Sequence, residues 1–156
     1  YAVERVAELL EADGDKHVLM SIGGNVRAIG NRADGTDFVV AVQNPDLSSA
    51  QHSIATLRMN GLSLVSSGDY QRYYIVDGKI YHHIIDPDTL MPAAYFRAVS
   101  IVTKDGGLAD ALSTALYNLP LEKGKALAES LPGVEALWVA RDGATAETDG
   151  FDALRN

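Results

Sequence analysis

The sequence predicts an α+β fold built on a mostly antiparallel sheet. Strand-like runs outnumber helical patterns along the chain, and the helical patterns are few and far apart. Two dipeptides, Asn60-Gly61 and Asp77-Gly78, separate runs rich in β-branched and aromatic residues, and such dipeptides are typical of tight hairpin turns. Frequent hairpins combined with separated helices favour an antiparallel sheet backed by helices over a βαβ arrangement.

Apolar runs mark the expected strands. They occupy residues 16–22, 25–30, 37–43, 53–59, 62–67, 70–76, 79–85, 97–103 and 134–140. We expect the first run to be buried and Gly23-Gly24 to turn the chain into the second. Asn60-Gly61 should join its two flanking runs in one hairpin, and Asp77-Gly78 should close another whose alternating pattern predicts one wet face.

Three segments show helical periodicity. In the first, apolar residues recur at helical spacing at Val3, Val6, Ala7 and Leu10. Gly14 follows in the usual position of a C-terminal cap. Two more helices are expected at 107–119 and 120–131, with Pro120 suited to open the second of them. We interpret the polar segment 141–150 as strand and turn.

Composition limits the class of protein. A chain of 156 residues with 47% hydrophobic residues can bury the core of one domain. It carries 13 basic and 21 acidic residues, a formal net charge of −8, which argues against nucleic acid and anionic membranes as partners. The absence of cysteine excludes disulfides and a Cys-ligated zinc site and leaves the compartment open. No run approaches the ~18 apolar residues of a membrane span.

The start of the chain lies inside an amphipathic helical pattern, without a capping residue or a leading polar turn. A helix that begins at the terminus is one explanation. We favour the other, that residues 1–156 form a single domain and are the C-terminal part of a longer protein. The lack of a signal peptide then carries no information about export.

Asp110 and Thr114 are the candidate metal ligands. They are four residues apart in the expected 107–119 helix, so both side chains leave the same face. A carboxylate and a hydroxyl suit a hard cation such as Mg²⁺. The alternative is structural: an aspartate in the first helical turn is favoured by the helix dipole, and Thr114 could bond back to the Asp110 carbonyl.

His83 is the candidate acid–base residue. His82 and His83 are adjacent on an expected strand and therefore face opposite sides, so only one can point into a site and the other should be solvated. His83 is followed by Ile-Ile-Asp-Pro, which puts it at a strand end beside a rigid loop, a place where catalytic groups often lie. An unperturbed histidine titrates near physiological pH, which suits proton transfer. An ordinary hydrogen-bonded strand histidine is the alternative.

Glycine- and serine-rich turns give weaker signals. The SSGDY segment, residues 66–70, is expected to be a turn that could offer backbone N–H groups to a phosphate or a carbonyl, although most such turns are only turns. Gly23, Gly24 and Gly30 form no dinucleotide-binding fingerprint because no helix follows them. The sequence also contains no P-loop, nucleophile elbow or H-E-x-x-H motif.

Four stretches, taken together and in order, resemble the ApbE flavin transferases, the FAD:protein FMN transferases formerly described as thiamine-biosynthesis lipoproteins. The stretches are YAVERVAELL, MSIGGNVRAIG, SSGDYQRYYIVDGKIYHHIIDPDTLMP and GLADALSTALY, and they cover the chain nearly from end to end. The resemblance implies a T-fold-like α+β domain with a mostly antiparallel sheet backed by helices. It also implies an enzyme that splits FAD, releases AMP and attaches FMN through a phosphoester to a Thr or Ser of a target flavoprotein.

The resemblance implies roles for six residues. Asp110 and Thr114 match the side chains that hold Mg²⁺, and His83 matches the histidine of an H-I-x-D-P motif, a base or a phosphate-side group. Attack of a hydroxyl on a pyrophosphate needs charge neutralised on the phosphate oxygens and a proton taken from the nucleophile, and these residue types suit both tasks. The positions expected to bind FAD are Ile84 and, more weakly, Ser67 and Gly68.

The sequence departs from the family pattern in three places. Leu90 stands where glycine is commoner, so we expect the 86–92 loop to avoid a positive φ there. Glu4 replaces an aspartate, a mild change. Residues upstream of Tyr1 that would supply a further Asp and a carbonyl to the metal, and a Lys or Glu to the flavin, are not in this chain. We therefore expect the chain alone to bind Mg²⁺ and FAD weakly or not at all.

Three functional hypotheses remain open at this point. The first is the Mg²⁺-dependent transferase, with FAD and an acceptor flavoprotein as partners. The family resemblance further implies a lipid-anchored parent on the periplasmic or extracellular face of the cell membrane. The second is an ApbE-like protein that binds or hydrolyses FAD without transfer. The third is a structural fragment with no activity of its own.

Overall fold

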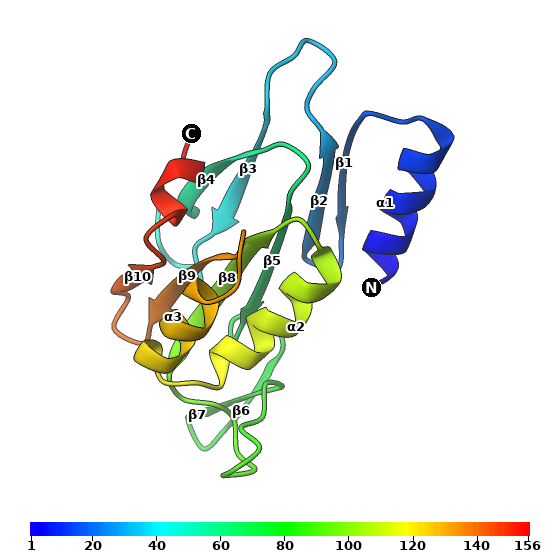
Figure 1. Ribbon diagram of the computed structural model, residues 1–156. Coiled ribbons are helices and arrows are strands. Elements are labelled where there is room, and N and C mark those ends of the chain that lie inside the picture. The colour runs from blue at the N-terminus through cyan, green and yellow to red at the C-terminus, as the bar shows by residue number, and fades with distance from the viewer.

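The computed structural model describes residues 1–156 and shows an antiparallel α+β architecture (Figure 1). Its helices are α1 Ala2–Asp13, α2 Gly106–Tyr117 and α3 Leu121–Glu129, with a short 3₁₀ helix, η1, at Phe151–Leu154. Its strands are β1 His17–Ile22, β2 Asn25–Gly30, β3 Phe38–Gln43, β4 Ser53–Met59, β5 Ser63–Gly68, β6 Tyr73–Val76, β7 Lys79–His82, β8 Phe96–Thr103, β9 Glu135–Ala140 and β10 Thr145–Glu147. Every strand pairing is antiparallel, which confirms the predicted fold class. None of the helices combines the length and the apolar character needed to cross a membrane.

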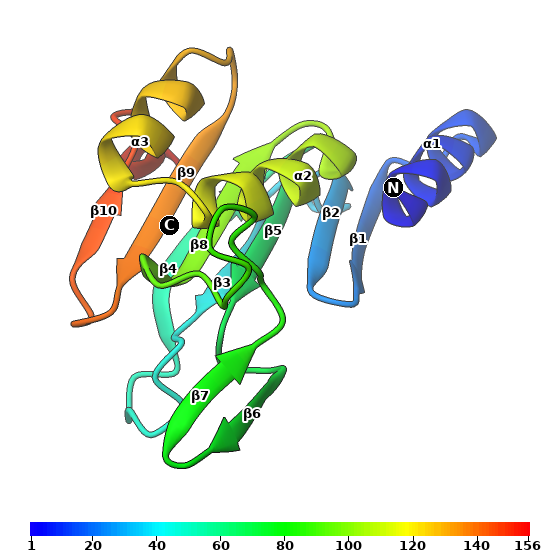
Figure 2. The same cartoon turned by 90° about the horizontal axis from the view of Figure 1, so that it is seen from below.

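The strands form one large sheet and two hairpins. The large sheet has the order β1-β2-β5-β8-β9-β10, while β3 pairs with β4 and β6 pairs with β7. Helices α2 and α3 cover one face of the large sheet, and α1 lies beside the β1–β2 edge (Figures 1 and 2). The β6–β7 hairpin projects from the rest of the molecule (Figure 2).

The central strands are buried on both faces, and their side chains alternate between two cores. Val65 and Ile101 pack toward α2 and α3, whereas Leu64 and Val102 pack toward the β3–β4 hairpin and η1. Because successive residues of a strand point to opposite faces, a continuous apolar run here serves two layers at once. The molecule is thus a helical layer, a six-stranded sheet and a smaller β layer.

Local signals predicted most turns correctly. Gly14 ends α1 in the left-handed conformation at φ 98°, and Gly23 and Gly24 turn β1 into β2 with φ 61° and 91°. Asp77 and Gly78 close the β6–β7 hairpin, again with positive φ. The predicted strand and turn in the polar segment is confirmed by β10. Helices α2 and α3 lie within one to two residues of their predicted bounds.

The hairpin predicted around Asn60-Gly61 is wrong. β4 pairs with β3, and β5 pairs with β2 and β8, so the dipeptide carries the chain from the small sheet to the large one. The physical reason is burial. The inward side chains of β4 pack onto the face of the large sheet. β5 is apolar on both faces, which is typical of a strand in the interior of a sheet, and it therefore has a neighbouring strand on each side.

Two further predictions are corrected. The 16–22 run, predicted to be buried, forms the edge strand β1, where Leu19 and Ile22 are exposed. An apolar run by itself does not show whether a strand lies at the centre or at the edge of a sheet. Leu90 adopts φ 57°, so the 86–92 loop keeps a left-handed residue there instead of avoiding it.

Candidate active site

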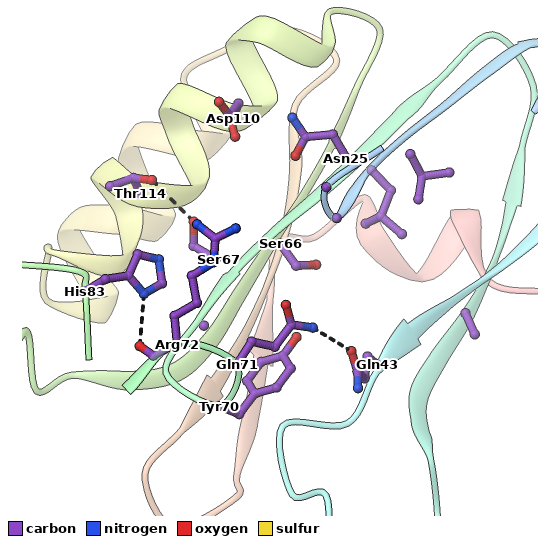
Figure 3. Close-up of a pocket in the computed structure, with 16 residues that line it drawn as sticks. Asn25, Gln43, Ser66, Ser67, Tyr70, Gln71, Arg72, His83, Asp110 and Thr114 are labelled. Atoms are coloured by element: carbon purple, nitrogen blue, oxygen red, sulfur yellow. Dashed lines mark hydrogen bonds between the residues drawn. The ribbon is translucent and has the colours of Figure 1, made fainter. Parts of the chain in front are cut away.

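A pocket of about 350 Å³ opens between α2, the end of β5 and the β1–β2 turn (Figure 3). Its size lies within the range of small-molecule sites, and its lining is mostly polar. It brings together five of the predicted site positions with several others. The labelled side chains in Figure 3 are Asn25, Gln43, Ser66, Ser67, Tyr70, Gln71, Arg72, His83, Asp110 and Thr114.

The pocket exists because β2 does not reach the end of β5. β2 pairs with β5 from Ser63 to Val65 only, whereas β8 pairs with β5 as far as Gly68. One edge of the β5 backbone at Ser66, Ser67 and Gly68 therefore has no strand beside it. The sequence predicted Ser66 and Ser67 both as the end of the 62–67 strand and as part of the 66–70 turn; the strand is confirmed, and pairing with β8 extends it to Gly68. The free strand edge places main-chain groups in the pocket wall.

Helix α2 is fixed at its N-terminus by two carboxylates. Asp105 accepts hydrogen bonds from the amides of Gly107 and Leu108, at 2.7 and 3.0 Å. Glu4, which reaches across from α1, accepts one from the Gly106 amide at 2.7 Å. Such bonds satisfy amides that have no partner within the helix and favour its start at this point. The two caps set the direction of α2 and so the position of the groups on its pocket face.

Asp110 and Thr114 lie on that pocket face, both exposed. Asp110 falls in the second turn of α2, so the first-turn dipole explanation for it does not apply. Thr114 does not bond back to the Asp110 carbonyl; Ser113 does so instead, at 3.0 Å. The Asp110 carboxylate forms no hydrogen bond or ion pair with the protein, and it is free to bind a ligand.

The two residues fit Mg²⁺ in kind. Hard oxygen atoms suit this cation, which is usually bound by one or two protein oxygens together with water and phosphate oxygens. Asp110 and Thr114 supply two such oxygens on adjacent turns, and no group of three or more His, Asp or Glu side chains occurs that could hold a metal by itself. These two residues would therefore hold the ion only together with further oxygen donors, such as water and the phosphates of a substrate.

Ser67 connects the end of β5 with α2. Its hydroxyl lies 2.8 Å from the Ser113 hydroxyl and 3.3 Å from the Thr114 hydroxyl. Gly68, the next residue, is required by close packing: a Cβ atom there would overlap the Tyr70 ring and lie 3.1 Å from the Arg97 carbonyl. Both predicted flavin-side residues thus line the pocket, one through its hydroxyl and one through its backbone.

Asp69 anchors the segment that follows β5. Its buried carboxylate forms an ion pair with Arg141 at 2.9 Å. The next residue, Tyr70, lines the pocket, and burial raises the pKa of its phenol, with a smaller contribution from the Asp69 charge. Tyr70 is therefore a neutral hydroxyl in the pocket wall at physiological pH.

His83 lines the pocket, and His82 does not. His83 Nδ1 lies 3.3 Å from the Arg72 carbonyl, which can only accept, so in the neutral ring Nδ1 carries the proton and Nε2 keeps a lone pair (Figure 3). His82 was expected to be solvated but is buried. It donates from Nε2 to the Ala93 carbonyl at 3.0 Å and accepts at Nδ1 from the Ile84 amide at 3.3 Å. A buried histidine is tolerated here because both ring nitrogens have partners.

Ile84 does not line the pocket. Its side chain is 5% exposed and belongs to the core between the sheet and α2. Its amide bonds to His82, and its carbonyl accepts from the Ala93 amide at 3.0 Å. In this structure Ile84 supports the strand end that presents His83.

Several pocket residues were not found from the sequence. Gln43, at the end of β3, and Gln71, in the loop between β5 and β6, share a hydrogen bond of 3.3 Å. Arg72 is the one Lys or Arg side chain in the lining. The one feature of the sequence that could have pointed to Arg72 is its position, as a basic residue of an acidic chain, between the SSGDY and HHIIDP stretches.

Comparison with known proteins gives consistent matches. The ApbE family model matches residues 1–138. FAD:protein FMN transferases from Klebsiella pneumoniae and Treponema pallidum are 32% and 34% identical over 143 and 151 residues, in each case 91% of this chain, and 43% and 41% of their own lengths. The ApbE protein from Thermotoga maritima superposes with a TM-score of 0.90 at 31% identity, over 100% of this chain and 50% of that one. The apo flavinyl transferase ApbE from Pseudomonas stutzeri gives 0.80 at 35%, over 99% and 48%.

The fold and the pocket define an antiparallel α+β domain with a polar, ligand-sized cleft at the end of its central strand. The chain belongs to the ApbE family. It spans at most half the length of the relatives that it matches.

Proposed function

We propose that the protein carrying this chain is a Mg²⁺-dependent FAD:protein FMN transferase. The supporting observation is that Asp110, Thr114 and His83, which come from distant parts of the sequence, line one pocket in a chain of the ApbE family. The relatives named as FAD:protein FMN transferases support the same reaction.

The proposed reaction joins a Thr or Ser hydroxyl of an acceptor flavoprotein to the FMN phosphorus of FAD. The new bond forms between the hydroxyl oxygen and that phosphorus, and the bond from the phosphorus to the bridging oxygen breaks, so AMP leaves with that oxygen. The hydroxyl proton passes to His83 Nε2, whose lone pair is set by the Arg72 carbonyl bond at Nδ1. The products are the flavinylated protein, AMP and one proton.

Asp110 and Thr114 would hold Mg²⁺ against the diphosphate. When bound, the ion supplies charge neutralisation on the phosphate oxygens as the phosphorus is attacked. Ser67 keeps the Thr114 hydroxyl in place from the opposite wall, and the free β5 edge offers main-chain groups to the polar rim of the flavin.

Transfer can be tested with the full-length protein, FAD, Mg²⁺ and an acceptor domain. We expect covalent flavin fluorescence on the acceptor in a denaturing gel, AMP in equal amount, and loss of both with EDTA. Asp110→Asn should abolish transfer at ordinary Mg²⁺, while Asp13→Asn, an exposed change on α1 away from the pocket, should leave it intact. AMP without covalent flavin would indicate an FAD hydrolase, and neither product would reject the proposed function.

We further propose, from the family resemblance, that the parent protein is lipid-anchored at the periplasmic or extracellular face of the membrane. Detergent-phase partitioning and labelling with a radioactive fatty acid would test this. Recovery of unlabelled protein in the aqueous phase would contradict it.

A further inference from the structure

Arg72 is one of two arginines whose guanidinium groups have no partner in the protein. The other six form ion pairs or hydrogen bonds: Arg5, Arg27, Arg32, Arg97, Arg141 and Arg155. Arg58, the second free arginine, is exposed on β4 and lies outside the pocket. Arg72 lines the pocket, so its unpaired charge belongs to the site.

The base of the Arg72 side chain is fixed. Its carbonyl accepts the His83 Nδ1 bond at 3.3 Å, and the next residue begins the β6–β7 hairpin. From there the side chain runs past His83 toward Ser67 and α2, with Asp110 further along the same wall (Figure 3). The guanidinium therefore belongs to the same pocket as the proposed base His83 and the proposed metal ligands Asp110 and Thr114.

The charges around it favour an anion as its partner. Apart from His83, Arg72 and Asp110 are the two acidic or basic side chains of the lining, and they form no ion pair with each other. The whole chain carries −8, which repels anions at long range, so a diphosphate needs local cations to bind here. A planar guanidinium donates two parallel hydrogen bonds to phosphate oxygens, which an ammonium group does less well.

We propose that Arg72 binds the diphosphate of FAD and thereby makes the pocket select FAD over flavins without a diphosphate. This inference rests on the proposed function. It gives the diphosphate two cations, the guanidinium of Arg72 and the Mg²⁺ that Asp110 and Thr114 would hold. Arg72 is then a substrate-binding residue, coupled through its own carbonyl to the orientation of the base.

Binding measurements without transfer test this. The full-length protein in EDTA would be titrated with FAD, with ADP, which has the diphosphate but no flavin, and with riboflavin, which has the flavin but no phosphate. Arg72→Gln should weaken FAD and ADP by ~10- to 100-fold, the range for a lost charged hydrogen bond, and leave riboflavin unchanged. Arg72→Lys should bind FAD and ADP with affinities between those of the wild type and Arg72→Gln, and Arg58→Gln should bind all three ligands as the wild type does.

The outcomes separate this inference from the proposed function. Equal FAD affinity for wild type and Arg72→Gln overturns the role of Arg72, and so does an equal loss for riboflavin, which would indicate a change of pocket shape. If the wild-type protein binds FAD neither in EDTA nor with Mg²⁺, the proposed function fails and the Arg72 inference fails with it. A salt dependence of FAD binding that is weaker in Arg72→Gln than in wild type would support the inference.

Discussion

The hydroxyl of Ser67 lies 3.3 Å from the hydroxyl of Thr114, and this contact joins the end of the central strand β5 to the candidate metal ligands on α2. Ser113 strengthens the link, since its hydroxyl lies 2.8 Å from that of Ser67. A ligand held from a second direction has fewer orientations to lose on binding, and such supporting contacts commonly tune metal affinity. The two walls of the pocket are therefore connected before any substrate arrives.

Removing either end of this contact should raise the Mg²⁺ requirement. We expect Thr114→Val and Ser67→Ala each to raise the Mg²⁺ concentration for half-maximal transfer by ~10-fold or more, with activity recovered at high Mg²⁺. Thr114→Ser keeps the oxygen and should stay close to wild type. Ser130→Ala, at the exposed end of α3, is the matched control. An unchanged Mg²⁺ dependence in Thr114→Val would remove Thr114 from the metal site.

Replacing His83 should lower the rate of transfer and leave FAD affinity almost unchanged. His83→Gln removes the lone pair proposed to accept the hydroxyl proton, so we expect kcat to fall by ~10²- to 10⁴-fold, the usual contribution of general-base catalysis. FAD affinity should change little. His52→Gln, at an exposed position outside the pocket, is the control. Normal transfer by His83→Gln would exclude the base role.

The sequence correctly predicted those features of the fold that depend only on residues close together in the chain. Asp77-Gly78 closed the expected hairpin because both residues must adopt positive φ, and that requirement is local. Asn60-Gly61 gives the same signal in the sequence, yet only Gly61 has a positive φ and the strands that the dipeptide joins pair elsewhere. Pairing was decided by how many faces of β5 are buried, and that depends on segments far away in the chain. Fold class followed from local patterns, while strand order did not.

The same limit applies to the site. Helical spacing put Asp110 and Thr114 on one face, and strand alternation separated His82 from His83, but neither rule showed which histidine is buried. Family resemblance favoured His83, which lines the pocket. Arg72 and the Ser67–Thr114 contact need the packing of β5 against α2, which no local pattern contains. The sequence alone thus identified candidate residues but not the contacts between them.

Gly68 should not tolerate a side chain. A Cβ there would overlap the Tyr70 ring and press on the Arg97 carbonyl, so we expect Gly68→Ala to destabilise the protein by ~1–3 kcal/mol, as overpacking does, and to displace Tyr70 in the pocket. Urea unfolding measures the first effect. Gly124→Ala is the contrast: its Cβ would meet Trp138 at an ordinary 3.5 Å inside α3, so stability should stay level or rise. Equal effects at both positions would contradict the packing argument.

Replacing Leu90 with glycine should stabilise the protein. Its φ of 57° costs an L-residue roughly 1–2 kcal/mol, whereas the extra flexibility of glycine in the unfolded chain costs about 0.5–1 kcal/mol. The side chain is 76% exposed, so little burial is lost. We therefore expect Leu90→Gly to raise stability by ~0.5 kcal/mol in thermal or urea unfolding. Leu47→Gly, exposed and without a positive φ, should lower stability, and a loss at both positions would show that Leu90 is not strained.

Tyr117 should make the protein sensitive to alkali. Its ring is fully buried, and its hydroxyl donates to the Phe96 carbonyl at 2.7 Å. Burial, and secondly the Asp69 charge, raise the pKa of its phenol in the folded state. Below the unfolded pKa of about 10 the phenol is neutral in both states and its contribution is fully present. Above that pH only the unfolded chain ionises, so stability should fall by up to ~1.4 kcal/mol per pH unit until the folded pKa is reached.

Tyr117→Phe separates this ionisation from packing. The variant loses one buried hydrogen bond and should be less stable than wild type at pH 8, by ~1 kcal/mol. Between pH 10 and 11 its stability should fall less steeply, because one of the groups that ionise on unfolding is gone, and the two curves should approach each other. Tyr70, whose pKa is also raised by burial, leaves a residual slope in both proteins. Tyr74→Phe, at a 78% exposed position, should run parallel to wild type in urea unfolding across this range. Parallel curves for wild type and Tyr117→Phe would mean that Tyr117 ionises as readily in the folded protein as in the unfolded chain.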